Sequence, residues 1–154
     1  MKFLLVFFFL LSFLFAGKIE IESLKFEAYD EKGITVFTGN VLIKKGLDRM
    51  HADNVTVYLD KDRQIERFEA SGNTSFVFNF ENNSTFVGSS DKFIYTPKNG
   101  EFKLLGSARI SDIINSKEII GEEVIFFEKT KVVKVLGAKM KPVRLIFDVE
   151  DSKK

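Results

Sequence analysis

The chain has 154 residues, enough for one domain with a buried core. It contains no cysteine, which excludes disulfide bonds and a thiol-linked lipid anchor. The formal net charge is +1 and the basic residues are scattered along the chain, a distribution that argues against nucleic-acid binding.

Residues 1–16 are predicted to be a signal peptide. Lys2 precedes an apolar block from Phe3 to Phe15, and Ala16 and Gly17 provide a small-residue exit. This block is shorter than the roughly 20 residues that a helix needs to cross a bilayer. We therefore expect cleavage after Ala16, a domain over residues 17–150 and a short charged tail over 151–154. A retained membrane anchor is the alternative, because Leu14 stands where a cleavage site normally has a small residue.

Past residue 18 the dominant period is two residues, which is typical of half-buried β-strands. In three windows, apolar residues and glycines on one face alternate with polar residues on the other. The one-face sets are Phe37, Gly39, Val41 and Ile43; Phe68, Ala70, Gly72, Thr74, Phe76 and Phe78; and Phe102, Leu104, Gly106, Ala108 and Ile110. Turn sequences such as "DEKG", "ENNS" and "TPKNG" punctuate the chain. We expect an all-β, antiparallel fold of meandering strands.

The strands recur as a two-strand unit. Gly39, Gly72, Gly106 and Gly137 are 33, 34 and 31 residues apart, a period in the range of repeat proteins. Each unit also has an acid two residues ahead of an apolar residue: Asp53 and Val55, Asp91 and Phe93, and Glu122 and Val124. About three and a half such units must stack on one another, because one unit cannot bury its own apolar face.

Stacking brings the unit glycines close together, and two interpretations follow. A file of glycines between Phe, Val and Ile side chains leaves a furrow in an apolar wall. Alternatively, each glycine marks a bulge or bend that curls the sheet. The two are compatible, since a sheet bent along a line of glycines also forms a trough.

Seven segments occur in a distinctive order between about residue 18 and residue 150. They are "KIEIESLKFEAYDEKGITVFTGNVLIKKG", "MHADNVTVYLD", "EASGNTSFVF", "SSDKFIYT", "LLGSARI", "IIGEEVIFFE" and "GAKMKPVRLIFDVED". In this order they resemble the LptA (OstA-like) family of periplasmic lipopolysaccharide-transport proteins of Gram-negative bacteria. The tail after Val149 is short and charged, which leaves any tail-dependent contact of the family in doubt for this chain.

The resemblance implies a curled, open antiparallel β-jelly-roll of stacked strand-pair repeats. It also implies a non-enzymatic periplasmic carrier that shelters the acyl chains of lipid A in an apolar trough, with no cofactor. Copies are expected to associate head to tail. They would bridge inner-membrane-anchored and outer-membrane transport components that have OstA-like domains, in the service of outer-membrane biogenesis.

Specific residues are expected to carry these roles. The predicted lipid-binding residues of the trough are Phe37, Val41, Ile43, Val55, Val57, Phe68, Phe76, Phe78, Phe93, Tyr95, Leu104, Ile110, Ile125, Phe127, Val133 and Val135. The residues predicted to form edge strands for assembly are Ile19, Ile21, Val143, Leu145 and Phe147. An ordinary packed sandwich core is the competing interpretation of the trough residues.

Two other functions stay open. If the N-terminal segment is retained, the protein is a membrane-tethered inner-membrane partner of the same fold. A structural β-stack without cargo is the second. An enzyme is not expected, because His51 is the single histidine and the acids do not converge on a site. Asp53, Asp91 and Glu122 are interpreted as acids that cap turns rather than as a cation site, so no metal is predicted.

Overall fold

The computed structural model of the chain describes residues 18–79 and 84–149. The predicted signal peptide, residues 1–16, and the tail, residues 151–154, lie outside the described residues. The elements are β1 (Ile19–Glu22), β2 (Lys25–Tyr29), the short 3-10 helix η1 (Asp30–Lys32), β3 (Ile34–Lys45), β4 (Asp48–Leu59), β5 (Ile65–Asn79), β6 (Thr85–Thr96), β7 (Glu101–Asp112), β8 (Lys117–Phe127), β9 (Val132–Leu136) and β10 (Arg144–Phe147).

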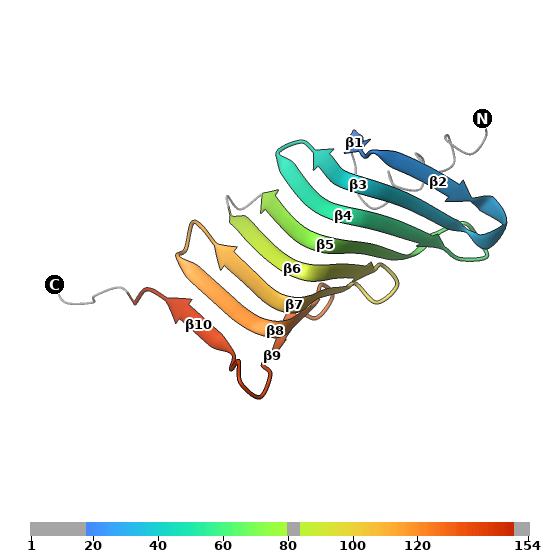
Figure 1. Ribbon diagram of the computed structural model, residues 1–154. Helices are drawn as coiled ribbons and strands as arrows, with labels where there is room; N and C mark the ends of the chain where they lie inside the picture. Colours follow the sequence, from blue (N-terminus) through green and yellow to red (C-terminus); the bar gives the residue numbers. More distant parts are fainter. Residues whose placement is uncertain (1–17, 80–83, 150–154) are drawn as a thin grey trace.

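The strands form one open antiparallel sheet, which confirms the predicted all-β architecture. The order is β1-β3-β4-β5-β6-β7-β8-β10, with β2 also paired to β3 and β9 also paired to β8. From β3 to β8 each strand pairs with the next in sequence, so the sheet advances steadily from the N-terminal to the C-terminal end (Figure 1). The sheet does not close, and its two ends are edges.

Each edge position is shared by two short strands. On β3, the strand β2 pairs with residues 34–38 and β1 pairs with residues 42–45. On β8, the strand β9 pairs with residues 123–127 and β10 pairs with residues 117–120. Each pair of short strands therefore takes the place of one full-length strand that is interrupted in its middle.

The full-length strands bend at the same height. The register shifts between Thr38 and Val41 on β3, between Ser71 and Thr74 on β5, and between Leu105 and Ala108 on β7. Each shift contains a glycine and a following residue that both have positive φ: Gly39 and Asn40, Gly72 and Asn73, and Gly106 and Ser107. These are β-bulges, which bend the strand that contains them. The bulges confirm the interpretation of these glycines as bends.

The same glycines do not leave a furrow. A Cβ on Gly72 would lie 2.8 Å from the Cβ of Asp53, and one on Gly106 would lie 2.9 Å from the Cβ of Asp91. Asp53 also accepts a hydrogen bond at Oδ2 from Nδ2 of Asn73 (3.2 Å). The interpretation of the glycine file as a furrow was therefore wrong, because an acidic side chain of the preceding strand covers each of these two glycines.

The other two glycines of the file have different surroundings. A Cβ on Gly39 would meet Leu24, at 2.9 Å from its Cβ. Gly137 follows β9 and starts the loop of residues 137–143 before β10. Ala138 forms an isolated bridge with Lys141 in this loop. A loop thus replaces the two-residue bulge at the C-terminal edge, and Gly137 does not continue the pattern of the other three.

The bend folds the sheet into two walls that face each other. Phe76 lies opposite Gly88 and Phe93 lies opposite Ala70, and the positions of Gly88 and Phe93 are about 16 Å apart along a straight β6. The rings of Phe76 and Phe93 nevertheless have centroids 5.9 Å apart. We call the wall with β2 and β9 the first wall and the wall with β1 and β10 the second wall.

Candidate functional site

The inner face of the first wall consists of two rows of side chains that cross the sheet in register. The first row, from β2 to β9, consists of Phe26, Phe37, Val55, Ala70, Phe93, Leu104, Val124 and Val135. Each of these residues pairs with the next one in the row. The second row lies one step further from the bend: Thr35, Val57, Phe68, Tyr95, Phe102, Phe126 and Val133. Neither row contains a charged residue.

The second wall presents a matching row on the other side of the bend. Its members, again paired in register, are Ile21, Ile43, Met50, Phe76, Gly88, Ile110, Ile119 and Leu145. Small residues pair between this row and the bend, including Val41 with Ala52 and Ala108 with Gly121. The two walls together form an apolar trough without a charged residue in these rows.

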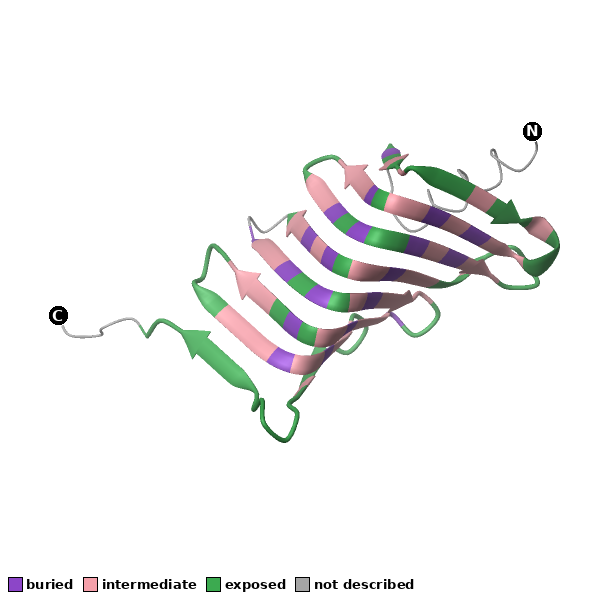
Figure 2. Ribbon diagram, in the orientation of Figure 1, coloured by how far each residue is buried: buried purple, intermediate pink, exposed green. Residues whose placement is uncertain are grey.

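The trough is packed at its bottom and half-open at its top. The buried cluster, which we call the vertex, consists of Phe37, Val41, Met50, Ala52, Val55, Ala70, Phe76, Phe93, Leu104, Ala108 and Val124. Partly buried side chains pack on it and form what we call the mouth: Ile21, Ile43, Phe68, Phe78, Tyr95, Phe102, Ile110, Ile119 and Val135. Figure 2 shows the buried positions along the middle strands and the exposed strands at both ends.

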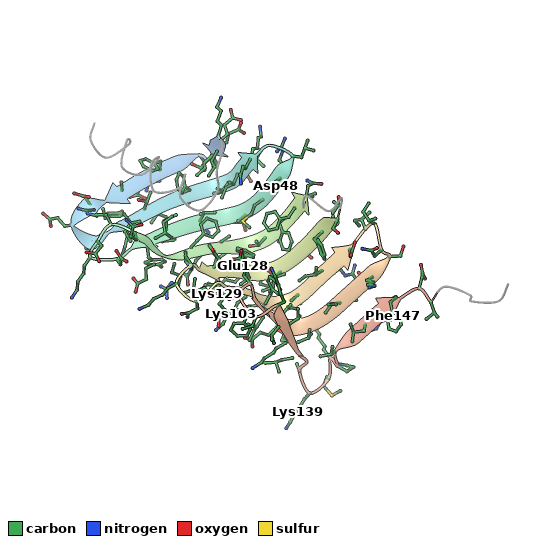
Figure 3. The ribbon with its side chains drawn as sticks, turned by 180° about the vertical axis from the view of Figure 1, so that it is seen from behind. Asp48, Lys103, Glu128, Lys129, Lys139 and Phe147 are labelled. Carbon is green, nitrogen blue, oxygen red and sulfur yellow. The ribbon has the colours of Figure 1, made fainter. Side chains whose placement is uncertain are left out.

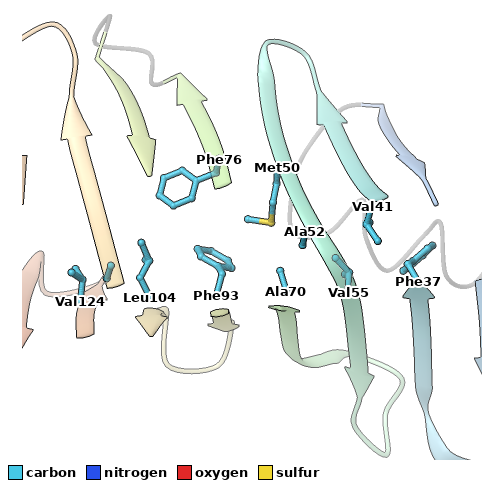
Figure 4. Packing of buried hydrophobic residues seen from close by; sticks show 11 residues of the cluster. Phe37, Val41, Met50, Ala52, Val55, Ala70, Phe76, Phe93, Leu104 and Val124 are labelled. Carbon is cyan, nitrogen blue, oxygen red and sulfur yellow. The ribbon is translucent and has the colours of Figure 1, made fainter. Parts of the chain in front are cut away.

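The vertex is filled by the protein's own side chains. Val41 and Val55 are each 1% exposed and Leu104 is 3% exposed. Figure 4 shows Phe76 and Met50 of one wall pointing toward Phe93 and Ala70 of the other. A ligand can therefore contact the vertex only if the walls separate, whereas the mouth is accessible as it stands.

Aromatic rings line the mouth on the first wall. Tyr95 and Phe102 stack with centroids 4.3 Å apart, and Phe102 lies 6.1 Å from Phe126. Burial raises the pKa of the Tyr95 hydroxyl, and the negative charge of Glu128 adds to the shift. The mouth thus has a broad apolar surface with one neutral polar group near its rim.

Phe76 joins the two walls in the middle of the trough. Its ring lies directly over Gly88, where a Cβ would collide with it. It also stacks on Phe78 (4.6 Å between centroids) in addition to its contact with Phe93. Glycine at position 88 is therefore what allows the ring to fold down between the walls.

The structure brings most of the predicted trough residues together, at different depths. Those at the vertex are Phe37, Val41, Val55, Phe76, Phe93 and Leu104, and those at the mouth are Ile43, Phe68, Phe78, Tyr95, Ile110 and Val135. Val57 and Val133 both belong to the second row of the inner face of the first wall. Val57 is 1% exposed and Val133 is 48% exposed.

Ile125 and Phe127 lie on the opposite face, so their placement in the trough was wrong. Ile125 pairs with Lys103 and Lys134, and the Lys134 Nζ lies 5.8 Å from the Phe127 ring centroid. Counting by twos from the inward-facing Gly121 leads to these two residues. The bend instead places two inward positions of β8 three residues apart, at Gly121 and Val124.

Several inward-facing residues were missed by sequence reasoning. They are Met50, Ala52, Ile119, Val124 and Phe126. Phe102 was placed on the apolar face of its strand but was not among the predicted lipid-binding residues. Val124 and Phe126 could have been predicted from the repeat, because Val124 stands two residues after Glu122 just as Val55 stands two residues after Asp53. Met50 and Ala52 alternate with His51 and Asp53 along β4.

The histidine and the acids do not form a metal centre within residues 18–79 and 84–149. His51 is exposed and pairs with Leu42 and Ser75 on the outer face. No group of three potential metal ligands occurs among the described side chains. In the same ranges, no helix has the length and apolar character required to cross a membrane.

The predicted edge residues lie at the two ends of the sheet. Ile19 and Ile21 belong to β1, and Leu145 and Phe147 belong to β10. Val143 immediately precedes β10 and is 37% exposed. The backbone groups on the outer side of each edge strand have no strand partner among the described residues.

Comparisons with known proteins agree with this geometry. Residues 20–132 match the family model described as "LptA/(LptD N-terminal domain) LPS transport protein". None of the curated proteins compared with the chain matches it. Among solved structures, the chain is similar to LptH of Pseudomonas aeruginosa, described as the LptA-homologous periplasmic component of the lipopolysaccharide transport device. The TM-score is 0.72 over 86% of this chain and 96% of that chain, at 14% identity, a likeness of fold.

Proposed function

Because the chain belongs to the LptA/(LptD N-terminal domain) family of lipopolysaccharide (LPS) transport proteins, we propose that it carries LPS across the periplasm with the acyl chains of lipid A in its trough. The observation that carries the proposal is the half-open mouth. Tyr95, Phe102, Ile110 and Ile119 remain partly exposed on facing walls although they belong to continuous apolar rows. An acyl chain laid along these rows would remove the remaining apolar surface from water.

The energetics favour this mode of binding. Each methylene buried contributes about 0.8 kcal/mol, so a lipid with several acyl chains needs to bury only part of each chain. The three rows described above contain no charged side chain that would have to lose its hydration; Asp112 and Lys117 stand in the next row of the second wall, paired with Phe86 and Phe147. The vertex supplies a packed support, and separation of the walls around Phe76 would admit chains more deeply.

Photocrosslinking in cells tests the carrier function. A benzoylphenylalanine probe at Tyr95 is expected to give a covalent LPS adduct, because this side chain lines the mouth. The same probe at Ile94, which faces outward opposite Lys103, is the matched control and is expected to give none. An absence of adducts at Tyr95, Phe102 and Ile119 in a folded protein would contradict the proposal and favour the interpretation of the trough residues as an ordinary packed core.

Head-to-tail association of copies is the second part of the proposal. The edges differ in charge: β1 and β2 contain Glu20, Glu22 and Glu27 against Lys25, whereas residues 129–147 contain Lys134 and Arg144 and no acid. Lys25 pairs with Glu27 and Lys44 pairs with Glu22, which leaves Glu20 as the acid of β1 available to a partner. Pairing of β1 with β10 of another copy satisfies the open backbone groups and leaves a new edge at each end, so a filament or bridge grows.

Because the chain has no cysteine, this association can be tested by disulfide formation. Glu20→Cys on β1 and Ile146→Cys on β10 are made as separate variants. A mixture of the two is expected to form a crosslinked dimer under oxidation, and neither variant alone is expected to do so. Equal crosslinking within one variant would indicate a symmetric contact and contradict the head-to-tail arrangement.

Release into the periplasm by signal-peptide cleavage after Ala16 completes the proposal. The family match supports it, since the similar LptH is described as periplasmic. Intact mass spectrometry of the protein from cells distinguishes a chain starting at Gly17 from one that retains residue 1. A full-length chain in the membrane fraction would favour the tethered inner-membrane partner instead.

A further inference from the structure

The two rims of the trough differ chemically. Alternate hairpins of an antiparallel sheet lie at opposite ends of the strands, so the turns of residues 30–33, 60–64, 97–100 and 128–131 border the first wall. The turns of residues 46–47 and 113–116 border the second wall. The first set is rich in charged residues. The turns 46–47 and 113–116 contain none and expose apolar side chains, and the charged residues that flank them pair with each other, Lys45 with Asp48 and Asp112 with Lys117.

The charged rim is basic toward its C-terminal end. The turns 97–100 and 128–131 contain Lys98, Lys129 and Lys131 against the single acid Glu128. The two turns are held together, because Glu128 donates its backbone N–H to the Gly100 carbonyl (2.8 Å). The Lys129 Nζ also donates to the Lys98 carbonyl (3.1 Å). Lys98 and Lys129 therefore share one small surface, and Lys131 follows in the same turn as Lys129.

This surface lies at the edge of the aromatic part of the mouth. Tyr95 and Phe102 flank the turn 97–100 in sequence and stack on each other, and Phe126 precedes the turn 128–131. The backbone hydrogen bond from Glu128 to Gly100 places the second turn beside the turn that follows Tyr95. Figure 3 shows Glu128 and Lys129 together at this end, away from Asp48 and Phe147.

The N-terminal part of the charged rim does not offer the same charge. Asp30, Glu31, Asp60 and Asp62 lie in its turns, and Arg63 is already paired with Asp30. An anion approaching the rim is therefore favoured at the turns 97–100 and 128–131.

The rim of the second wall suits a different part of an amphipathic molecule. Leu47, Ile113 and Ile114 are 77%, 55% and 61% exposed. Their backbone is tied to neighbouring strands, since Asn79 donates to the Leu47 carbonyl (3.2 Å) and Ile113 donates to the Thr85 carbonyl (3.0 Å). These side chains are thus held at the rim as a fixed apolar border.

We propose that Lys98, Lys129 and Lys131 form a phosphate subsite for the anionic head of the lipid that the trough carries. This inference rests on the proposed function and gives the cargo one orientation. The phosphorylated head lies over the basic turns, and an acyl edge of the lipid lies against Leu47, Ile113 and Ile114. Ammonium groups bind phosphate oxygens through short charge-assisted hydrogen bonds, which supports the choice of ligand chemistry.

The test compares two lipids on the full mature chain: bisphosphorylated lipid A and the same lipid after chemical removal of its phosphates. The double variant Lys98→Glu/Lys129→Glu is expected to bind the phosphorylated lipid roughly tenfold or more weakly at low salt. It is expected to bind the dephosphorylated lipid as the wild type does. The matched control Lys32→Glu/Lys61→Glu reverses two charges on the acidic part of the same rim and is expected to change neither affinity by more than about twofold.

The outcomes separate this inference from the carrier function. Equal weakening for both lipids, or for both double variants, would overturn the phosphate subsite while leaving lipid binding in place. A wild type that binds neither lipid would overturn the carrier function and the subsite with it. Circular dichroism and urea unfolding of each variant verify that the exposed substitutions leave the fold intact.

Discussion

The vertex and the mouth of the trough have the same alternating sequence pattern but different exposure. Leu104 at the vertex is 3% exposed, whereas Phe102, two residues earlier on the same face of β7, is only partly buried. On β7 the difference follows the distance from the bend, because both walls cover side chains near it; the same second row is buried nearer the N-terminal end of the sheet, where Val57 is 1% exposed. The comparison teaches that stability resides mainly in the vertex and that ligand contact is available at the mouth.

Truncation at the vertex is expected to have the largest effect. Leu104→Ala should lower the free energy of unfolding by about 2–5 kcal/mol, because it leaves a cavity between Phe93 and Val124. Leu105→Ala, which faces outward opposite Lys92 and Glu123, is the matched control. Urea denaturation measures both. Equal losses at the two positions would contradict the distinction between the two faces.

A substitution at the bend is expected to have an intermediate effect. Gly106→Ala should cost about 1–3 kcal/mol, since φ is +81° and the new Cβ meets Asp91. Gly46→Ala has φ +57° with nothing within 4 Å and should cost about 1 kcal/mol. Adding Asp91→Gly to Gly106→Ala removes the whole Asp91 side chain, and comparison with the single variant Asp91→Gly separates the steric contribution from the backbone contribution. An unchanged unfolding midpoint in Gly106→Ala would show that the bend does not require glycine.

A polar substitution at the mouth is expected to change stability least. Ile119→Thr should weaken lipid binding several-fold while costing less than about 1.5 kcal/mol of unfolding free energy, because Ile119 is half-buried and threonine keeps the β-branch. Ile120→Thr, on the outer face opposite Arg109, provides the control. Titration with fluorescent LPS and urea denaturation report the two quantities. A loss of stability as large as that of Leu104→Ala would place Ile119 in the core.

The sequence was sufficient to predict the open antiparallel sheet and the inner faces of the long odd-numbered strands. On β5, the inward-facing residues Ala70 and Thr74 are four positions apart across the bulge. Because four is an even number, a strict alternation of inward and outward residues correctly predicts that both Phe68 and Phe76 face inward. On β8 the corresponding inward residues are three apart, and alternation by twos led to Ile125 instead of Val124. On β4 and β6 the inward-facing positions also change parity at the bend, between Ala52 and Val55 and between Ser90 and Phe93, and no glycine marks the place.

The depth of the trough was beyond sequence reasoning. Val55 and Tyr95 occupy similar positions in apolar runs, yet one is 1% exposed and the other lines the mouth. Exposure depends on how far the two walls close on each other, which is decided by contacts such as Phe76 with Phe93. Those contacts join residues on opposite sides of the bend, and the alternation of apolar and polar residues along one strand does not predict them. Coverage of Gly72 by Asp53 is equally non-local, since it crosses from one strand to the next.

The uniform position of the bend also sets how the molecule can change size. A unit such as β5 with β6 pairs with the strand before it and the strand after it through the same register shift, the same bulge and the same kind of covering acid. A duplicated unit would therefore fit between its neighbours without a new kind of contact. Each added unit would lengthen the trough by about 10 Å, two strand spacings, while its cross-section stays constant. The length of the apolar trough in this architecture is thus set by the number of units, and a gene segment of about one hundred bases encodes one unit.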